Sequence, residues 1–227
     1  MADILKILAD PGAFPWIAFV FGLAAGSFLN VVIHRLPKMM DREWLENVPQ
    51  ILEDSKEFGD PVEAKRLALK VREQLERSGN ERLDLIAPRS RCPACGHRIG
   101  ALENIPVLSY LVLRGKCSAC SARIGARYPA VELLAGVVAG YAAWRFGFGV
   151  TAFAAMFFLW CLIALTFIDI DHTNLPDDIT LLLLWVGLLL NMRPVFAPSL
   201  ASAIIGAAAG YLSLWSLYWA YKLLRNR

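Results

Sequence analysis

Carboxylates gather in one short stretch of the chain, LTFIDIDHTNLPDDIT at residues 165–180. It holds four aspartates within ten positions between two apolar runs, namely Asp169, Asp171, Asp177 and Asp178. Two carboxyl groups held close together can share a proton, so that one acts as a base on water while the other acts as an acid. The stretch therefore raises the possibility of acid–base catalysis, with a polar membrane boundary as the plainer alternative.

The plainer alternative accounts for only part of this stretch. Asp177 and Asp178 follow Pro176 and suit the capped start of a helix at the water boundary. Asp169 fits less well, because it directly adjoins apolar residues, where an ionisable group is expensive and is often functional. We therefore take Asp169 as the candidate catalytic residue.

Cysteines form a second pattern with chemical meaning. The segments CPACGHRIG (92–100) and CSACSARIG (117–125) each contain a C-x-x-C pair, and 21 residues separate the two pairs. This spacing is typical of a four-thiolate zinc site to which each pair contributes two ligands. The pattern predicts one structural zinc bound by four residues, Cys92, Cys95, Cys117 and Cys120.

Other roles for these cysteines stay open. Paired disulfides would suit an oxidising compartment, and a redox C-x-x-C would need only one pair. His97 could replace one thiolate as a metal ligand. Because four thiolates already complete the ligand set, His97 is expected to lie beside the ligands or to be free. Cys161, the fifth cysteine, lies in an apolar run and is expected to pack there.

The composition indicates a membrane protein with one polar domain. Mean hydropathy is +0.47 and 57% of the residues are hydrophobic, yet most charges lie in the first half of the chain. Residues 14–33 contain no charge, and such a length crosses roughly 30 Å of hydrocarbon. A cleaved signal peptide is the alternative, but Asp3, Lys6 and Asp10 precede the segment in place of a basic cluster.

Four further apolar segments predict four further spans, at 129–144, 150–168, 179–192 and 199–221. Glu132 lies inside the second span, and its simplest interpretation is a residue at the membrane boundary. The predicted fold class is an all-α polytopic membrane protein with a small cytoplasmic zinc-knuckle domain after the first span.

Basic residues predict the orientation. Residues 35–130 hold 17 of the 23 Lys and Arg residues and the terminal YKLLRNR holds three, which leaves three for the opposite side. Cytoplasmic loops carry the excess of Lys and Arg, so the long loop, the aspartate stretch and the C-terminus are expected in the cytoplasm.

These expectations divide the chain into three parts. Residues 1–34 form the first span, and residues 35–128 form a cytoplasmic loop with the zinc-binding domain at about 88–128. Residues 129–227 form a bundle of four spans that carries Asp169. Within 41–85, apolar residues at helical spacing after Pro61 predict a solvated amphipathic helix.

Several segments in one order resemble the bacterial type IV prepilin peptidases. They are AAGSFLNVVIHRLPKMM, ENIPVLSYLVLRGKCSAC between and within the cysteine pairs, RYPAVELLAG, FIDIDHTNLPDDIT and GYLSLWSLYWAYKLL. The resemblance runs from about residue 20 to the end and is loose over 41–85.

The resemblance implies a particular activity. Family members are inner-membrane aspartic peptidases that cut the short basic leader from type IV prepilins and type II secretion pseudopilins, after a glycine. They then N-methylate the new terminus with S-adenosylmethionine. The partners implied are those precursors and the lipid bilayer, with no nucleic acid. The first Asp of the D-x-D segment is catalytic in the family and lies seven residues before the proline, which corresponds to Asp169.

The chain departs from the family pattern at one point. The second catalytic aspartate of the family comes from a G-x-G-D motif, which occurs nowhere in these 227 residues. The sequence therefore resembles a chain that stops short of this residue, and we expect the 1–227 chain alone to lack peptidase activity. Asp177 is a weaker substitute, because Pro176 intervenes and the family's aspartate at that place is not catalytic.

The N-terminal motif GSFLNVVIHRLP carries further candidates. Gly26 and Ser27 allow close helix contact, and Asn30, His34 and Arg35 could bind a substrate or lie among lipid headgroups. No G-x-G-x-x-G loop is present, so the residues that bind S-adenosylmethionine stay unassigned. The alternative function is a non-catalytic, zinc-containing membrane protein that binds pilin precursors or secretion-assembly components.

The charge distribution generates a topology prediction with the N-terminus outside and the C-terminus inside. A cysteine introduced near Arg145 should react with an impermeant maleimide on intact cells, whereas one near Lys56 should require permeabilised cells. The parent chain without the added cysteine serves as the control. The reverse labelling pattern would contradict this orientation.

Overall fold

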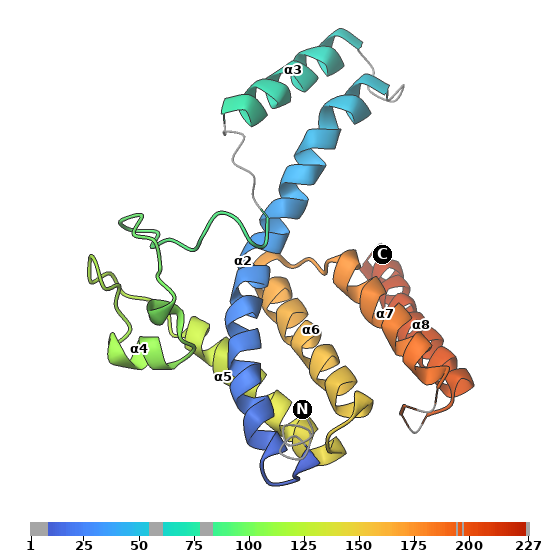
Figure 1. The fold of residues 1–227 in the computed structure, drawn as a ribbon. Coiled ribbons are helices and arrows are strands. Elements are labelled where there is room, and N and C mark those ends of the chain that lie inside the picture. Colours follow the sequence, from blue (N-terminus) through green and yellow to red (C-terminus); the bar gives the residue numbers. More distant parts are fainter. Residues whose placement is uncertain (1–8, 55–60, 78–83, 194, 197, 226–227) are drawn as a thin grey trace.

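The computed structural model describes residues 9–54, 61–77, 84–193, 195–196 and 198–225, and within them it is helical with no strand. Figure 1 shows long helices with a loop region projecting from one side. The elements are α2 (Phe14–Asp54), α3 (Pro61–Arg77), η1 (Leu102–Asn104), α4 (Leu108–Val112), α5 (Arg127–Phe146), α6 (Val150–His172), α7 (Asp177–Asn191) and α8 (Leu200–Arg225). Asp3, Lys6 and Lys56, used above, lie outside the described residues.

The helix that contains the first predicted span is much longer than that span. α2 has 41 residues and runs through Pro37 and Pro49 to Asp54, whereas the prediction placed a loop from residue 35. Helix-favouring residues after Pro37 sustain it, and Arg42 pairs with Glu46 one turn later at 2.9 Å. At 1.5 Å per residue the helix is about 60 Å long, which is twice the hydrocarbon thickness.

The helix predicted after Pro61 is confirmed as α3, which packs beside the far end of α2 (Figure 1). Its buried side chains are the small ones, Ala64 at 3% and Ala68 at 0% exposure. Val62 and Leu69, which contributed to the predicted apolar face, are 75% and 57% exposed. Alanine lets two helices approach closely, and among the described side chains of α3 the two alanines are the buried ones.

The four later apolar segments are all helices, α5 to α8. Among the described residues, three helices are long and apolar enough to cross a membrane: α2, α6 and α8. α7 has only 15 residues, and α5 has 20 with polar residues at both ends. The structure thus supports three of the five predicted spans by length and composition, and the other two stay predictions.

Glycines bring α2 and α5 into close contact. A Cβ atom at Gly22 would lie 2.6 Å from the Ala135 carbonyl oxygen, and one at Gly26 would lie 2.5 Å from the Glu132 Cα atom. Gly136 faces the same contact from α5, where a Cβ would meet Leu23 at 2.8 Å. Gly22 and Gly26 are spaced as in the G-x-x-x-G pattern of packed membrane helices.

α6 completes the central bundle by packing on α5 and α2. The Trp160 indole donates a hydrogen bond to the Ala135 carbonyl at 3.1 Å. Buried side chains of α2, α5 and α6 form two cores, around Met156 and around Ile168. α7 and α8 lie to one side as a pair, and α8 has no buried residue (Figure 1).

Replacing Gly26 by alanine should destabilise the bundle. The added methyl group meets backbone at 2.5 Å, and overpacking of this kind costs about 1–3 kcal/mol. Gly206→Ala on α8 is the matched control, because nothing lies within 4 Å of its Cβ position and alanine favours helix. Thermal unfolding in detergent should show a lower Tm for Gly26→Ala alone. Equal Tm values would contradict the close contact.

Candidate functional site: a four-cysteine cluster and an aspartate turn

The two C-x-x-C segments fold as matching knuckles. In the first, the Cys92 N–H donates to the His97 carbonyl at 2.8 Å, and in the second the Cys117 N–H donates to the Ala122 carbonyl at 2.8 Å. The fourth residue after each leading cysteine has a positive φ, 71° at Gly96 and 58° at Ser121. The repeat seen in the sequence is therefore a repeat in backbone geometry.

The four cysteine sulfurs converge on one point. All four lie within 4.8 Å of one another, and the Cys92 and Cys120 sulfurs are 3.8 Å apart. A disulfide bond is about 2.05 Å long, whereas zinc–sulfur bonds of about 2.3 Å in a tetrahedron place the sulfurs about 3.8 Å apart. All five cysteines are free thiols, so this donor set fits a metal ion.

The thiols influence one another's ionisation. Backbone N–H groups of Ala94 and Cys95 lower the pKa of Cys92 to about 7, although burial opposes this. The Ala122 N–H lowers the pKa of Cys120, but the thiols of Cys95, Cys117 and Cys92, together with burial, raise it to about 12. Crowded sulfurs disfavour full ionisation without a cation, which a bound metal would supply.

A carboxylate joins the two knuckles. Glu103 accepts hydrogen bonds from the Gly100 N–H at 2.8 Å and from the Ser118 hydroxyl, and His97 Nε2 lies 3.2 Å from it. In that order these contacts lower the pKa of Glu103 to about 2, so it stays ionised down to strongly acidic pH. His97 thus lies beside the cluster and is not one of its four ligands.

Residues near the end of the first predicted span fix the loop to α2. The largely buried Arg35 donates to the carbonyls of Asp84 at 2.8 Å and Pro88 at 2.5 Å, just before the first knuckle. Asn30 donates to the Tyr128 carbonyl at 3.0 Å, at the start of α5. Two of the polar residues considered for substrate binding therefore make internal contacts.

Glu132 also makes an internal contact. Its carboxylate accepts the N–H of Val107 at 2.7 Å and interacts with the Ser27 side chain. Val107 has a φ of 59°, which is unfavourable for a β-branched residue. Glu132 therefore holds the segment between the knuckles against α5, which is more than the boundary role predicted for it.

The aspartate stretch forms the last turn of α6 and the turn into α7. Asp169 is exposed, and its side chain has no hydrogen-bond partner among the described residues. Its apolar neighbours in sequence lie on other faces of α6, which is a candidate membrane span, and the apolar environment expected for Asp169 stays a prediction.

Asp171 is held by an arginine that follows the second knuckle. Arg127 donates to the Asp171 carboxylate at 2.7 Å and to the Phe167 carbonyl at 3.3 Å, and it stacks over the Phe167 ring at 4.8 Å. The knuckle region and the turn that carries Asp169 are thus joined through one side chain.

Asp177 and Asp178 lie in the first turn of α7, as predicted, but the N-cap position is Pro176 and no side chain caps the helix. The predicted capping hydrogen bond is therefore not formed. Carboxylates in a first turn still interact favourably with the positive end of the helix dipole.

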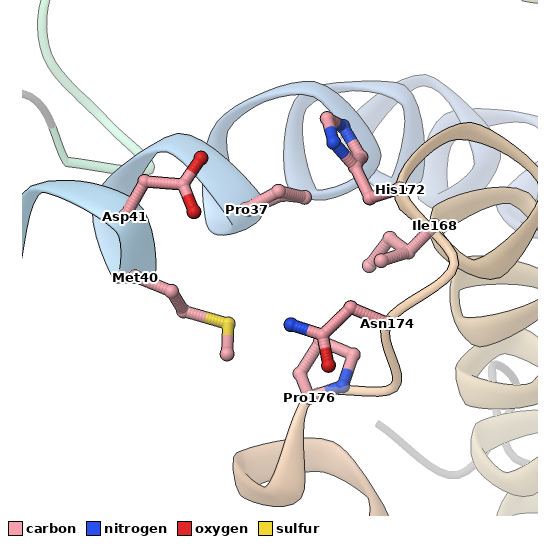
Figure 2. A pocket seen from close by; sticks show the side chains of 7 residues that line it. All are labelled: Pro37, Met40, Asp41, Ile168, His172, Asn174 and Pro176. Atoms are coloured by element: carbon pink, nitrogen blue, oxygen red, sulfur yellow. The ribbon is translucent and has the colours of Figure 1, made fainter. Parts of the chain in front are cut away.

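A small pocket lies beside the aspartate turn. Figure 2 shows it between α2 and the turn from α6 to α7. Its volume is about 110 Å³, and it is lined by Pro37, Met40 and Asp41 of α2, by Ile168 and His172 of α6, and by Asn174 and Pro176 of the turn. Ile168 and His172 lie on either side of Asp169 in the same helix.

Sequence reasoning missed four residues of this region: Asp41, Glu103, Arg127 and Asn174. Glu103 and Arg127 make contacts between distant segments, and Asp41 and Asn174 line a pocket formed by distant segments. Only Arg127, directly after the second knuckle and before RYPAVELL, stands at a place in the sequence that could have drawn attention to it.

The chain matches two families in succession. Residues 20–146 match the Bacterial Peptidase A24 N-terminal domain, and residues 156–224 match the Type IV leader peptidase family. No solved structure matches the chain.

Three similar proteins share one name, prepilin leader peptidase/N-methyltransferase. The protein from Stutzerimonas stutzeri is 46% identical over 227 residues, which cover all of this chain and 71% of that relative. The one from Pseudomonas aeruginosa is 45% identical over 225 residues, which cover 99% and 70%. The one from Aeromonas hydrophila is 47% identical over 217 residues, which cover 94% and 68%.

The fold and site define a class of helical proteins with long apolar helices, a four-cysteine loop and an exposed aspartate at the end of one helix. The two matched peptidase families cover this architecture in turn: the first matches residues 20–146 and the second matches residues 156–224. The chain belongs to the prepilin leader peptidase/N-methyltransferase family.

Proposed function

We propose that this chain provides the first catalytic aspartate and the metal-binding loop of a membrane-embedded aspartic endopeptidase. The enzyme removes the leader of type IV prepilins and type II secretion pseudopilins and N-methylates the new terminus with S-adenosylmethionine. The observation that carries the proposal is the position of Asp169 near the end of α6, within the match to the Type IV leader peptidase family, where its exposed side chain has no hydrogen-bond partner in the described part of the chain.

Asp169 would act with a second carboxylate. One carboxylate takes a proton from water, which attacks the scissile carbonyl, while the protonated partner donates to the carbonyl oxygen. In the family the partner comes from G-x-G-D, which these 227 residues do not contain. We therefore expect the 227 residues alone to cleave no prepilin.

The other three aspartates would have supporting roles. Asp171 is engaged by Arg127, and Asp177 and Asp178 begin α7. Engagement with Arg127 keeps Asp171 from acting as the proton-sharing partner. Asp177 lies beyond Pro176 at the start of another helix, so we assign it no catalytic role.

Cys92, Cys95, Cys117 and Cys120 would hold one structural zinc ion. Sulfur spacing, matching knuckle geometry and free thiols support this assignment. Bound zinc would fix the two knuckles together and thereby place Arg127 against α6. The contacts of Glu103 with both knuckles would support the same arrangement.

The proposed location is the bacterial inner membrane with five spans and the cysteine loop in the cytoplasm. The excess of basic residues over 35–130 and at the C-terminus supports this orientation. A reducing cytoplasm also suits four free thiols.

Asp169→Asn in a family protein that includes the G-x-G-D segment should abolish prepilin cleavage. The amide keeps the size of the side chain but cannot exchange the proton, so turnover should fall by several orders of magnitude. Asp178→Asn is the matched control and should cost at most about 1 kcal/mol of local stability through the helix dipole. Cleavage is followed by mass spectrometry of a prepilin substrate. Near-normal turnover by Asp169→Asn, or efficient cleavage by the 227 residues alone, would refute the two-aspartate assignment.

Metal analysis of the purified chain should give close to one zinc per molecule. Cys117→Ser should lose most of that zinc and make the loop sensitive to protease, because metal binding contributes to folding of a small domain. Cys161→Ser, which lies on α6 away from the cluster, should keep both zinc and protease resistance. A metal-free chain with a protease-resistant loop would argue against the zinc site.

A further inference from the structure

The pocket beside the aspartate turn is built from two segments far apart in the chain. Asp41 and Met40 come from α2 beyond the predicted membrane span, and Ile168, His172 and Asn174 come from the end of α6 and its turn (Figure 2). Ile168 precedes Asp169 directly, and His172 follows it by one helical turn. A group bound in this pocket would therefore contact the same turn of α6 that carries Asp169, although Asp169 itself does not line the pocket.

Three polar side chains of the pocket have no hydrogen-bond partner among the described residues: Asp41, His172 and Asn174. Other polar side chains of this region are engaged, such as Arg127 with Asp171 and Arg35 with the Asp84 carbonyl. The amide of Asn174 points into the hollow, toward Met40 on the opposite wall (Figure 2). The pocket thus offers unused hydrogen-bonding groups above an apolar lining.

Size limits what the pocket can hold. Pockets for cofactors and drug-sized ligands measure about 300–1,000 Å³, whereas this one measures about 110 Å³. A volume of about 110 Å³ suits a group no larger than a side chain. S-adenosylmethionine is too large for it.

The lining specifies the kind of side chain. Met40, Ile168 and Pro176 offer an apolar surface, and Asp41 offers a carboxylate at the edge. Lysine and arginine bury a hydrocarbon stem while keeping a charged head available for a carboxylate. A long cationic side chain therefore satisfies both parts of the lining, whereas an acidic one would be repelled by Asp41.

We propose that this pocket is a substrate subsite that receives one lysine or arginine side chain of the prepilin, close to the bond that is cut. Met40 and Ile168 contact the stem, Asp41 pairs with the cationic head, and Asn174 hydrogen-bonds the peptide main chain. Arg127 fixes the last turn of α6 through Asp171 and so keeps the α6 side of the pocket in place. The inference rests on the proposed function and names the residues that select its substrate.

Peptide binding tests the subsite without requiring cleavage. The probe is a fluorescein-labelled synthetic peptide with the leader and first mature residues of a type IV prepilin and a single lysine on the leader side of the cut. Its affinity for the purified chain in detergent is measured by anisotropy. Asp41→Asn should weaken binding about tenfold, as expected for loss of a charge-assisted hydrogen bond. Glu43→Gln, also on α2 but outside the pocket lining, should bind as the wild type does.

A charge swap guards against a merely structural effect. Replacing the peptide lysine by norleucine should weaken binding to the wild type about tenfold and change nothing further for Asp41→Asn, as in a double-mutant cycle. Asp41→Lys should bind the lysine peptide poorly and recover affinity for a peptide with glutamate in its place. Recovery of this kind cannot come from a misfolded variant.

Other results of the binding experiment would contradict the subsite. Equal affinity of wild type and Asp41→Asn for the lysine peptide would overturn the subsite while leaving Asp169 and the peptidase proposal intact. An effect of Asp41→Asn on S-adenosylmethionine binding alone would assign the pocket to the methyl donor and also overturn the subsite. No binding of the lysine peptide by the wild type would also overturn the subsite, whereas the proposed function is tested separately by Asp169→Asn.

Discussion

The close approach of α2 and α5 is the contact on which the rest of this structure depends. Gly22 and Gly26 on one helix face Gly136 on the other, and any larger side chain at these places would meet backbone or packed atoms within 3 Å. Because lipid tails are as apolar as leucine, helices in a membrane gain little from burying large apolar side chains, and close packing of small residues stabilises their association. The buried residues of α5 are accordingly small, with alanine the commonest of them.

This contact brings the polar elements to one end of the bundle. With α5 against α2, Asn30 reaches the Tyr128 carbonyl, and Arg35 holds the chain that leads into the first knuckle. The second knuckle leads directly into α5, whose first residue, Arg127, binds Asp171 on α6. The cysteine cluster and the aspartate turn are therefore positioned by the same helix pair, although they are about fifty residues apart in sequence.

Much of this arrangement could be predicted from the sequence, because it depends on local patterns. Apolar length indicated all five long helices of the bundle region, and the C-x-x-C spacing indicated that four sulfurs would converge, as they do. The pairing of Arg127 with Asp171 could not be predicted, since it depends on how α5 and α6 pack. The continuation of α2 past residue 34 was missed because the uncharged apolar run ends at residue 33, whereas the structure continues the helix through Pro37 to Asp54.

The sequence also could not show that the Asp169 side chain has no hydrogen-bond partner within the residues that the structure describes. Neighbours in sequence suggested apolar surroundings, but on a helix the adjacent residues point to other faces. Ile168 is buried in the core, while Asp169 is exposed next to it. Among the described residues, Asp171 is engaged by Arg127, whereas the Asp169 carboxylate has no hydrogen-bond partner, as is also true of Asp177 and Asp178 at the start of α7.

The central claim, that α2 and α5 are in close contact at Gly22, can be measured directly with an engineered disulfide. The Cβ position of Gly22 lies 2.8 Å from the Ala139 Cβ, near enough for a disulfide after slight adjustment. The variant carries Gly22→Cys and Ala139→Cys together with a protease site introduced within residues 55–60. Because the residues before that site contain no native cysteine, a disulfide that joins the two fragments must include Cys at position 22. After oxidation and cleavage, the two fragments should stay joined on non-reducing gels and separate when reduced. The control is Trp16→Cys with Ala139→Cys, which should give separate fragments because Trp16 is 72% exposed. Separate fragments from the Gly22 pair under the same oxidation would contradict the account.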